Sequence, residues 1–178
     1  MSQSASSSTP FLPLNIAVMT VSDSRTEEDD KSGNLLVRKL QESGHQLAEK
    51  SIVPDNRYRI REVLSRWIAD EEIHAVITTG GTGLTGRDIT PEAVQPLFDK
   101  TIEGFGEVFR SISYGMIKTS TIQSRAIAGL ANGTPIFCLP GSTGACKDGW
   151  ENIIKFQLDI RHMPCNLVEI MPRFRESE

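Results

Sequence analysis

Residues 76–94 read VITTGGTGLTGRDITPEAV and place a glycine-rich turn next to an acidic side chain. The small residues from Gly80 to Gly83 would let successive backbone N–H groups point into one cavity, where an anion such as phosphate could bind. Asp88 follows the turn, and a carboxylate beside bound phosphates is a common ligand of a bridging Mg²⁺. The alternative is that the glycines only turn a tight corner between a strand and a helix.

The glycines also match two nucleotide-binding patterns, but only by their spacing. Gly81, Gly83 and Gly86 fit G-x-G-x-x-G, yet the next helix is not expected to open within the glycine run, as that motif requires. The pattern G-x-x-x-x-G-K-[S/T] fails as well, because Arg87 and Asp88 stand where the lysine and the hydroxyl should be. The hypothesis that the chain is a dinucleotide-binding oxidoreductase therefore rests on glycine spacing alone.

Two further loops could bring polar groups to the same place. Asp55 follows an apolar run. Its carboxylate could bind the same ligand as Asp88, or Asp55 could be the N-cap of a helix that begins near Arg57. The residues alone favour the cap. Pro140-Gly141-Ser142 ends another apolar run and could supply small backbone donors to the site, or it could only cap the last helix.

The apolar residues indicate strands and helices in alternation. Three short apolar runs, at residues 15–21, 45–53 and 74–79, predict buried strands. A helix is expected at residues 34–43, and a second helix follows the second strand, because apolar residues recur there every three or four positions. This stripe comprises Ile60, Val63, Leu64, Trp67 and Ile68.

The second half of the chain adds a hairpin and two more helices. Thr90 is a suitable N-cap for a helix with Pro91 at its first position. Further on, two apolar runs flank Asn132-Gly133, the sequence signal of a tight hairpin, so we expect one antiparallel strand. A last helix presents one apolar face, formed by Trp150, Ile153, Ile154 and Leu158. The tail after Arg161 is expected to pack as irregular structure.

These elements predict the α/β class, with a doubly wound, mainly parallel sheet, helices on both faces and one antiparallel strand from a hairpin. A chain of 178 residues with 38% hydrophobic content can bury one core. Residues 14–178 should therefore form a single domain after a disordered, Ser-rich tail at residues 1–13. Ligands of such sheets bind at the carboxyl ends of the strands, where Asp55, Asp88 and the glycine loop would meet.

Charge and cysteine content exclude several classes of partner. The 19 basic and 23 acidic residues give a net charge of −4, and no basic cluster is interleaved with aromatic residues, so we expect no nucleic-acid partner. Three cysteines without a C-x-x-C pair are typical of a reducing cytoplasm. No apolar run approaches the roughly 18 residues of a membrane span. His45, His74 and His162 are too far apart in sequence to suggest a metal site, and Cys138 lies in an apolar run typical of the core.

The order of several longer motifs resembles one family. The motifs are TVSDSR, DKSG, TTGGTGLTGRDITPEA, GFGEVFR, QSRAIAGLANGT and LPGSTGACKDGWENI. Together they span about residues 15–166 and are similar to those of the MoaB/Mog family of molybdenum cofactor biosynthesis proteins, closest to its MoaB branch. This resemblance implies a doubly wound α/β fold, assembly into trimers or hexamers, and a cytoplasmic molybdopterin adenylyltransferase that uses ATP.

The same resemblance implies a reaction and a set of residues. The terminal phosphate of molybdopterin would attack the α-phosphorus of ATP with the assistance of Mg²⁺, giving adenylylated molybdopterin and pyrophosphate. Asp55 and Asp88 would be the catalytic residues and the metal ligands, which favours the ligand role of Asp55 over the cap. The implied substrate-binding residues are Ser22, Gly80, Gly81, Thr82, Gly83, Glu107, Ser124, Arg125, Pro140, Gly141 and Ser142. The alternative is a molybdopterin-binding or scaffolding protein without turnover, and either role would bring contact with other proteins of the pathway.

Overall fold

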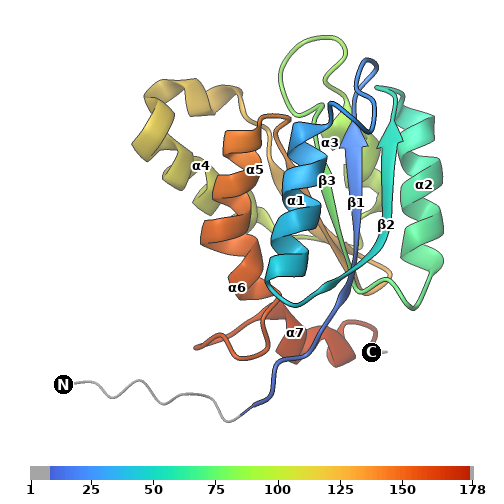
Figure 1. Cartoon of the computed structure of the whole chain (residues 1–178), viewed down its shortest axis with the longest axis vertical. Helices are drawn as coiled ribbons and strands as arrows, with labels where there is room; N and C mark the ends of the chain where they lie inside the picture. The colour runs from blue at the N-terminus through green and yellow to red at the C-terminus, as the bar shows by residue number, and fades with distance from the viewer. Residues whose placement is uncertain (1–8, 177–178) are drawn as a thin grey trace.

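A six-stranded sheet passes through the centre of the structure, with helices packed on both of its faces (Figure 1). The structure is a computed structural model that describes residues 9–176. The strands are β1 (Asn15–Val21), β2 (Gln46–Val53), β3 (Ala75–Thr79), β4 (Lys100–Thr101), β5 (Ile127–Ala131) and β6 (Thr134–Leu139). They lie in the order β2-β1-β3-β6-β5-β4, and the first four are parallel to one another. The predicted fold class is confirmed, although the two-residue strand β4 was not expected.

The predicted hairpin joins β5 to β6. These strands are antiparallel, with residue pairs that run from Ile127 opposite Cys138 to Ala131 opposite Thr134. Asn132 and Gly133 between them have φ angles of 49° and 80°. Two left-handed residues in succession are what a tight hairpin turn requires, and Asn-Gly meets this requirement at little steric cost.

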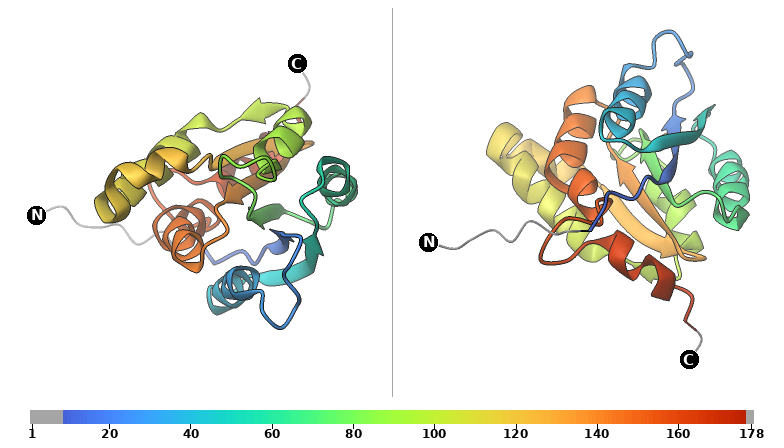
Figure 2. Two further views of the ribbon diagram at one scale, coloured as in Figure 1. Left: turned by 90° about the horizontal axis from the view of Figure 1, so that it is seen from above. Right: turned by 60° about the horizontal axis from the view of Figure 1, so that its bottom comes forward.

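Two groups of helices cover the two faces of the sheet, as the view from above shows (Figure 2, left). Helices α1 (Lys31–Glu42), α4 (Glu103–Ile117), α5 (Thr143–Gly149) and α6 (Lys155–Gln157) lie on one face. Helices α2 (Arg57–Ala69) and α3 (Thr90–Val94) lie on the other. A π-helical segment at Trp150–Ile154 joins α5 to α6, and 3-10 turns occupy Gln95–Leu97 and Lys118–Gln123.

The core consists of two apolar layers, one on each side of the sheet. Along β1, Ile16 and Val18 face the layer of α1, whereas Ala17 and Met19 face the layer of α2. This alternation follows from the two-residue period of a strand. Because both faces are covered there, the central strands β1, β3 and β6 are buried at almost every position, whereas the edge strand β2 carries several polar residues. Cys138 is fully buried in this core, where burial raises the pKa of its thiol to about 12.

Two local expectations and the cap alternative for Asp55 are wrong. Asn56 caps α2 in place of Asp55, because its Oδ1 accepts the backbone N–H groups of residues 58 and 59 at 3.0 and 3.1 Å. Thr90 lies inside α3 and does not cap it; its hydroxyl donates to the carbonyl oxygen of Gly80 at 2.8 Å. The tail after Arg161 is partly helical, with α7 at Leu167–Ile170 and a 3-10 turn at Met171–Arg173.

The strand order creates a crevice between β1 and β3. From β1 the chain moves to β2 on one side, and from β2 it returns past β1 to β3 on the other side. Figure 1 shows β1 and β2 pointing toward the same group of loops at the top of the molecule. Loops that leave neighbouring parallel strands in opposite directions open a crevice at their carboxyl ends, and this switch point is where α/β sheets bind ligands.

At the opposite end of the sheet, two histidines hold the start of β1. The backbone N–H of Leu14 donates to Nδ1 of His45 at 3.2 Å, and the N–H of Asn15 donates to Nδ1 of His74 at 2.9 Å. The ring of Phe11 lies 5.1 Å from that of His45, so contacts with the domain begin before residue 14. The sequence predicts a disordered tail at residues 1–13, and residues 1–8 of this tail lie outside the described residues.

His45 should make stability depend on pH. Burial lowers its pKa below the ordinary value of 6.5, more than the negative charge of Asp159 raises it, and the positive charge of Arg161 adds to the lowering. The unfolded chain therefore takes up a proton first as the pH falls, so this contribution is complete above about pH 6.5 and is lost below it. We expect the free energy of unfolding, measured by urea titration, to fall between about pH 7.5 and about pH 5.5.

The variant His45→Asn should reduce that fall, because an amide oxygen can accept the N–H of Leu14 without titrating. His162→Asn is the matched control, since this half-buried histidine stacks on Phe156 at 5.0 Å and accepts no backbone N–H. Equal pH dependence in wild type and His45→Asn would contradict the assignment.

Candidate functional site

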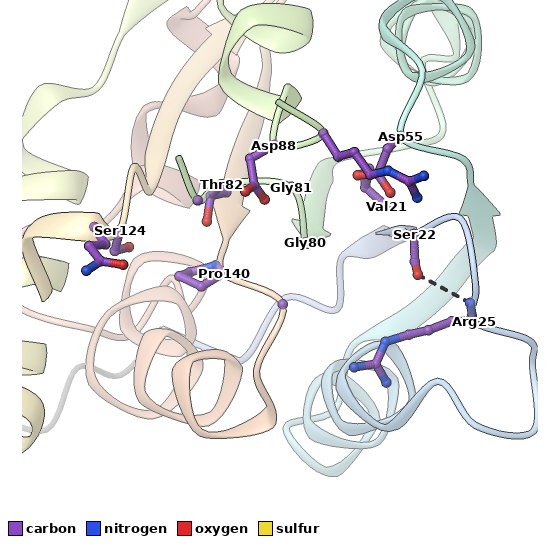
Figure 3. A pocket seen from close by; sticks show the side chains of 14 residues that line it. Val21, Ser22, Arg25, Asp55, Gly80, Gly81, Thr82, Asp88, Ser124 and Pro140 are labelled. Atoms are coloured by element: carbon purple, nitrogen blue, oxygen red, sulfur yellow. Dashed lines mark hydrogen bonds between the residues drawn. The ribbon is translucent and has the colours of Figure 1, made fainter. Parts of the chain in front are cut away.

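A cavity of about 470 Å³ lies at the crevice between the carboxyl ends of β1 and β3. Figure 3 shows Ser124 and Pro140 toward one end of it, Asp55 and Ser22 toward the other, and Asp88 between them. Most of the residues expected at the site line this cavity. They are Ser22, Asp55, Gly80, Gly81, Thr82, Gly83, Asp88, Ser124, Pro140 and Gly141.

The glycine loop is shaped by two left-handed residues. Gly80 and Gly81 have φ angles of 103° and 66°, and a Cβ on Gly80 would collide with the backbone carbonyl of Val21. The N–H of Gly80 donates to the carbonyl of Leu139 at 3.0 Å, so it is held by β6. Among the described residues, the N–H groups of Gly81 and Thr82 have no acceptor. These two amides are therefore free to bind an anionic ligand.

Asp88 is held in its ionised form by the loop that precedes it. Its Oδ2 accepts the backbone N–H of Thr85 at 2.8 Å and the Thr85 hydroxyl at 2.7 Å. Burial acts to raise the pKa of Asp88, but these hydrogen bonds and one from the Gly83 backbone outweigh it, so the pKa lies below its ordinary value. Asp88 is a carboxylate at neutral pH, and it also keeps the loop closed.

Asp55 lies in a less favourable environment for its charge. Burial and the negative charge of Asp23 raise the pKa of Asp55, and Asp88 adds to this effect. A hydrogen bond from the Asp23 backbone N–H and the positive charge of Arg87 oppose the rise without cancelling it. A group whose charged form is disfavoured by neighbouring carboxylates gains from a bound cation.

The donor atoms of the cavity suit Mg²⁺, which also binds water and substrate phosphates, better than they suit a metal ion held by protein side chains alone. Residues 9–176 contain no group of three or more His, Cys, Asp or Glu side chains arranged to hold a metal ion. Mg²⁺ is usually held by one or two carboxylates, with water and substrate phosphates as its other ligands. Asp55 and Asp88 on the wall of one cavity match that donor set.

Three expected residues lie outside the cavity lining. Arg125 supports the loop: its Nε donates to the Gly83 carbonyl at 2.8 Å, its Nη2 donates to the Asp88 carbonyl at 2.7 Å, and its Nη1 pairs with Glu92. Ser142 is the N-cap of α5, and its Oγ accepts the N–H of Ala145 at 3.1 Å. Glu107 lines a separate cavity beside α4.

Ser124 carries the clearest sign of a missing partner. Its hydroxyl oxygen is buried and has no hydrogen-bond partner, and the residue lines the cavity. A buried polar group without a partner costs free energy that a hydrogen-bonding ligand can recover. Ser124 is thus positioned to contact a polar ligand, whereas the hydroxyl of Ser22 already accepts two N–H groups of its own loop.

Four lining residues were not expected from the sequence: Val21, Arg25, Arg87 and Gln123. Arg25 could have been found, because it follows the first strand in SDSR and so belongs to the same sheet edge as Asp55. Arg87 directly precedes Asp88, and a cation in an anion-binding loop is itself a signal. Gln123 carries no comparable signal in the sequence.

The fold and the position of the cavity define a doubly wound α/β protein with a cavity at the switch point of the sheet, where proteins of this class bind ligands. Within the described residues no helix is long and apolar enough to cross a membrane. Residues 17–160 match the model of a family described as a probable molybdopterin binding domain, and the chain belongs to this family, as the MoaB/Mog resemblance implied.

Individual relatives agree with that assignment. Molybdenum cofactor biosynthesis protein B of Escherichia coli (strain K12) is 57% identical over 159 residues, which cover 89% of this chain and 94% of that protein. The crystal structure of the tungsten cofactor synthesizing protein MoaB from Pyrococcus furiosus superposes with a TM-score of 0.78 at 38% identity, covering 92% and 98% of the two chains. The Mog protein from Mycobacterium ulcerans gives 0.68 at 28% identity, covering 76% and 89%.

A side chain at Gly83 should disturb the site without disturbing the fold. A Cβ there would lie 2.7 Å from Oδ2 of Asp88, so Gly83→Val must displace that carboxylate. Because the displaced carboxylate would disturb the loop that carries the free amides, we expect ATP binding to weaken by about tenfold or more, the scale of losing one hydrogen bond to a charged group. Isothermal calorimetry with ATP and Mg²⁺ measures the affinity, and circular dichroism checks the fold.

Gly86→Val is the matched control, because nothing lies within 4 Å of a Cβ at Gly86 in the same loop. This variant should bind ATP like the wild type. If Gly83→Val also binds ATP normally, the glycine loop is only a corner between β3 and α3.

Proposed function

We propose that this chain acts in molybdenum cofactor biosynthesis and transfers AMP from ATP to molybdopterin at the cavity between β1 and β3. Family membership and the names of the relatives support the pathway. The observation that carries the chemical step is that Asp55 and Asp88 share one cavity with the free amides of Gly81 and Thr82. Cytoplasmic location follows as part of this proposal, since the substrates of the pathway would be met there.

The reaction joins two polyanions. An oxygen of the terminal phosphate of molybdopterin forms a bond to the α-phosphorus of ATP, while the bond from that phosphorus to the bridging oxygen breaks. Pyrophosphate leaves with the electron pair. Such a transfer depends on in-line placement and on compensation of charge more than on a strong base.

The residues of the chain supply placement. The free N–H groups of Gly81 and Thr82 would bind phosphate oxygens, and the unpaired hydroxyl of Ser124 would bind a polar group of one substrate. Arg25 and Arg87 add positive charge to the same lining. These contacts would hold the phosphates of the two substrates in line for the attack.

The negative charge of the two carboxylates favours a bound cation. Two aspartates in a cavity that receives phosphates would repel the substrate, so a positive ion between them and the ligand would be favourable there. Asp55 and Asp88 would hold Mg²⁺, which when bound neutralises charge on the phosphates and the leaving pyrophosphate. Burial and, after it, the negative charges of Asp23 and Asp88 raise the pKa of Asp55.

Asp88→Asn separates binding from turnover. Asparagine retains an oxygen that can accept the hydrogen bonds from Thr85, so the loop should stay closed, but the charge that would hold Mg²⁺ is lost. We expect molybdopterin binding to persist and adenylylation to fall by on the order of a hundredfold or more. Product formation from ATP and molybdopterin, followed by chromatography, measures the rate. Asp55→Asn should show a loss of the same kind.

Asp99→Asn is the control, because this exposed aspartate also accepts a loop N–H, that of Asn132 at 2.6 Å, away from the cavity. Wild-type protein that binds molybdopterin but forms no product would instead support a binding or scaffolding role. Normal turnover in Asp88→Asn would keep the enzyme and overturn the assignment of its metal ligand.

Assembly into trimers or hexamers is part of the proposal. Large apolar side chains are exposed on α4 and on the 3-10 turn after it, the segment that protrudes beside the label α4 in Figure 1. They are Val108, Tyr114, Met116, Ile117 and Ile122, each with between 48% and 75% of its surface exposed. Exposed apolar patches of this kind usually mark interfaces.

The molar mass in solution should be a multiple of three chains when light scattering is measured at micromolar concentration. Ile122→Glu should shift the population toward smaller species, because it places a charge in the apolar patch. Tyr58→Glu is the matched control, since Tyr58 on α2 is 72% exposed and lies outside that patch. A monomeric wild type would contradict the proposed assembly.

A further inference from the structure

Asp23, a residue absent from the cavity lining, contacts two of the loops that form the cavity. We propose that Asp23 is a positioning residue, which fixes the carboxylate of Asp55 relative to Asp88 and so sets the affinity of the site for a divalent cation. This inference rests on the proposed function, because it assumes that Asp55 and Asp88 hold that cation. Asp23 itself belongs to the loop between β1 and α1.

Asp23 and Asp55 are joined by two reciprocal hydrogen bonds. The backbone N–H of Asp55 donates to Oδ1 of Asp23 at 2.9 Å, and the backbone N–H of Asp23 donates to Oδ2 of Asp55 at 3.1 Å. Each aspartate thus caps the backbone of the other across 32 residues of sequence. The pair ties the loop after β1 to the loop after β2.

The second oxygen of Asp23 reaches a third loop. Nη1 of Arg87 lies 3.0 Å from Oδ2 of Asp23, and Arg87 directly precedes Asp88 in the loop after β3. One carboxylate therefore connects the two loops that carry the proposed metal ligands. The Arg87 side chain is 79% exposed, so this ion pair alone adds little stability, and the bonds to Asp55 are the stronger constraint.

Both oxygens of Asp23 are occupied by the protein, whereas Asp55 keeps one oxygen free. Only Oδ2 of Asp55 accepts a hydrogen bond among the described residues, which leaves Oδ1 without a protein partner. Holding Oδ2 prevents the carboxylate from rotating freely, so the position of Oδ1 is set before a cation arrives. Mg²⁺ demands near-ideal octahedral geometry, and its affinity is sensitive to such restraint.

Two substitutions distinguish positioning from direct ligation. Asp23→Ala removes the acceptor for the Asp55 N–H, whereas Asp23→Asn retains an oxygen that can accept it and loses only the charge. Asp70→Ala is the matched control, because Asp70 also accepts a loop N–H, that of Glu72 at 3.0 Å, in the turn after α2 and away from the cavity. Melting temperatures of all variants show whether the fold is intact.

The primary readout is binding of Mn²⁺ alone, followed by the electron paramagnetic resonance signal of the free ion. We expect Asp23→Ala to weaken Mn²⁺ binding by about tenfold, the scale seen when partners of metal ligands are removed. Asp23→Asn and Asp70→Ala should stay within about threefold of wild type. In turnover assays the Mg²⁺ concentration for half-maximal rate should rise by the same factor in Asp23→Ala, with the KM for ATP at saturating Mg²⁺ unchanged.

Unchanged Mn²⁺ binding in Asp23→Ala would overturn the inference, and so would an equal loss in Asp23→Ala and Asp23→Asn, because the charge of Asp23 would then act directly. The proposed function fails separately. A wild type that binds Mn²⁺ but forms no adenylylated molybdopterin contradicts the reaction, while the comparison of Asp23 variants by Mn²⁺ titration still decides the role of Asp23. Absence of Mn²⁺ binding by the wild type would overturn the inference about Asp23, while the adenylylation assay would still decide the proposed function, because substrate phosphates supply further metal ligands during turnover.

Discussion

The chain leaves β3 through Gly80 and Gly81, and this turn is possible only because neither residue has a side chain. Both have left-handed φ angles, and the backbone of Gly80 passes so close to the carbonyl of Val21 that a Cβ would not fit. The turn directs the loop over the end of β1 instead of straight into α3. As a result, Asp88 lines the same cavity as residues from the loops of β1 and β2, and Gly81 and Thr82 line it as well.

Beneath this loop, a buried charge fixes the neighbouring elements. Asp30 is fully buried at the N-terminus of α1, where its carboxylate accepts the Thr20 hydroxyl at 2.7 Å and the Gly33 N–H at 3.0 Å and pairs with Lys50 at 3.0 Å. Burial acts to raise the pKa of Asp30, but these contacts together leave it lowered. The network ties β1, α1 and β2 together, so the loops at the cavity extend from a rigid base.

Sequence patterns predict the parts of this structure that depend on local chemistry. The strands follow from apolar runs, because strands covered on both faces must be apolar, and the hairpin follows from Asn132-Gly133, because its turn needs two left-handed residues. Local chemistry could not decide between Asp55 and Asn56, two adjacent residues that cap helices equally well. The role of Asp23 depends on a contact with residues 32 and 64 positions away, which no local pattern contains. Arg125, likewise, supports the loop from outside the cavity.

The two aspartates in the cavity differ in a way that their residue type does not reveal. Oδ2 of Asp88 accepts two hydrogen bonds from Thr85, and the pKa of Asp88 is lowered, so part of its charge is already compensated by the loop. Asp55 has a raised pKa and one oxygen without a protein partner, so its charge is compensated least. Under the proposed function, a cation that enters the cavity would gain most from Asp55, whereas Asp88 would contribute a fixed second ligand. The loop hydrogen bonds would thus give two identical side chains unequal parts in holding the same ion.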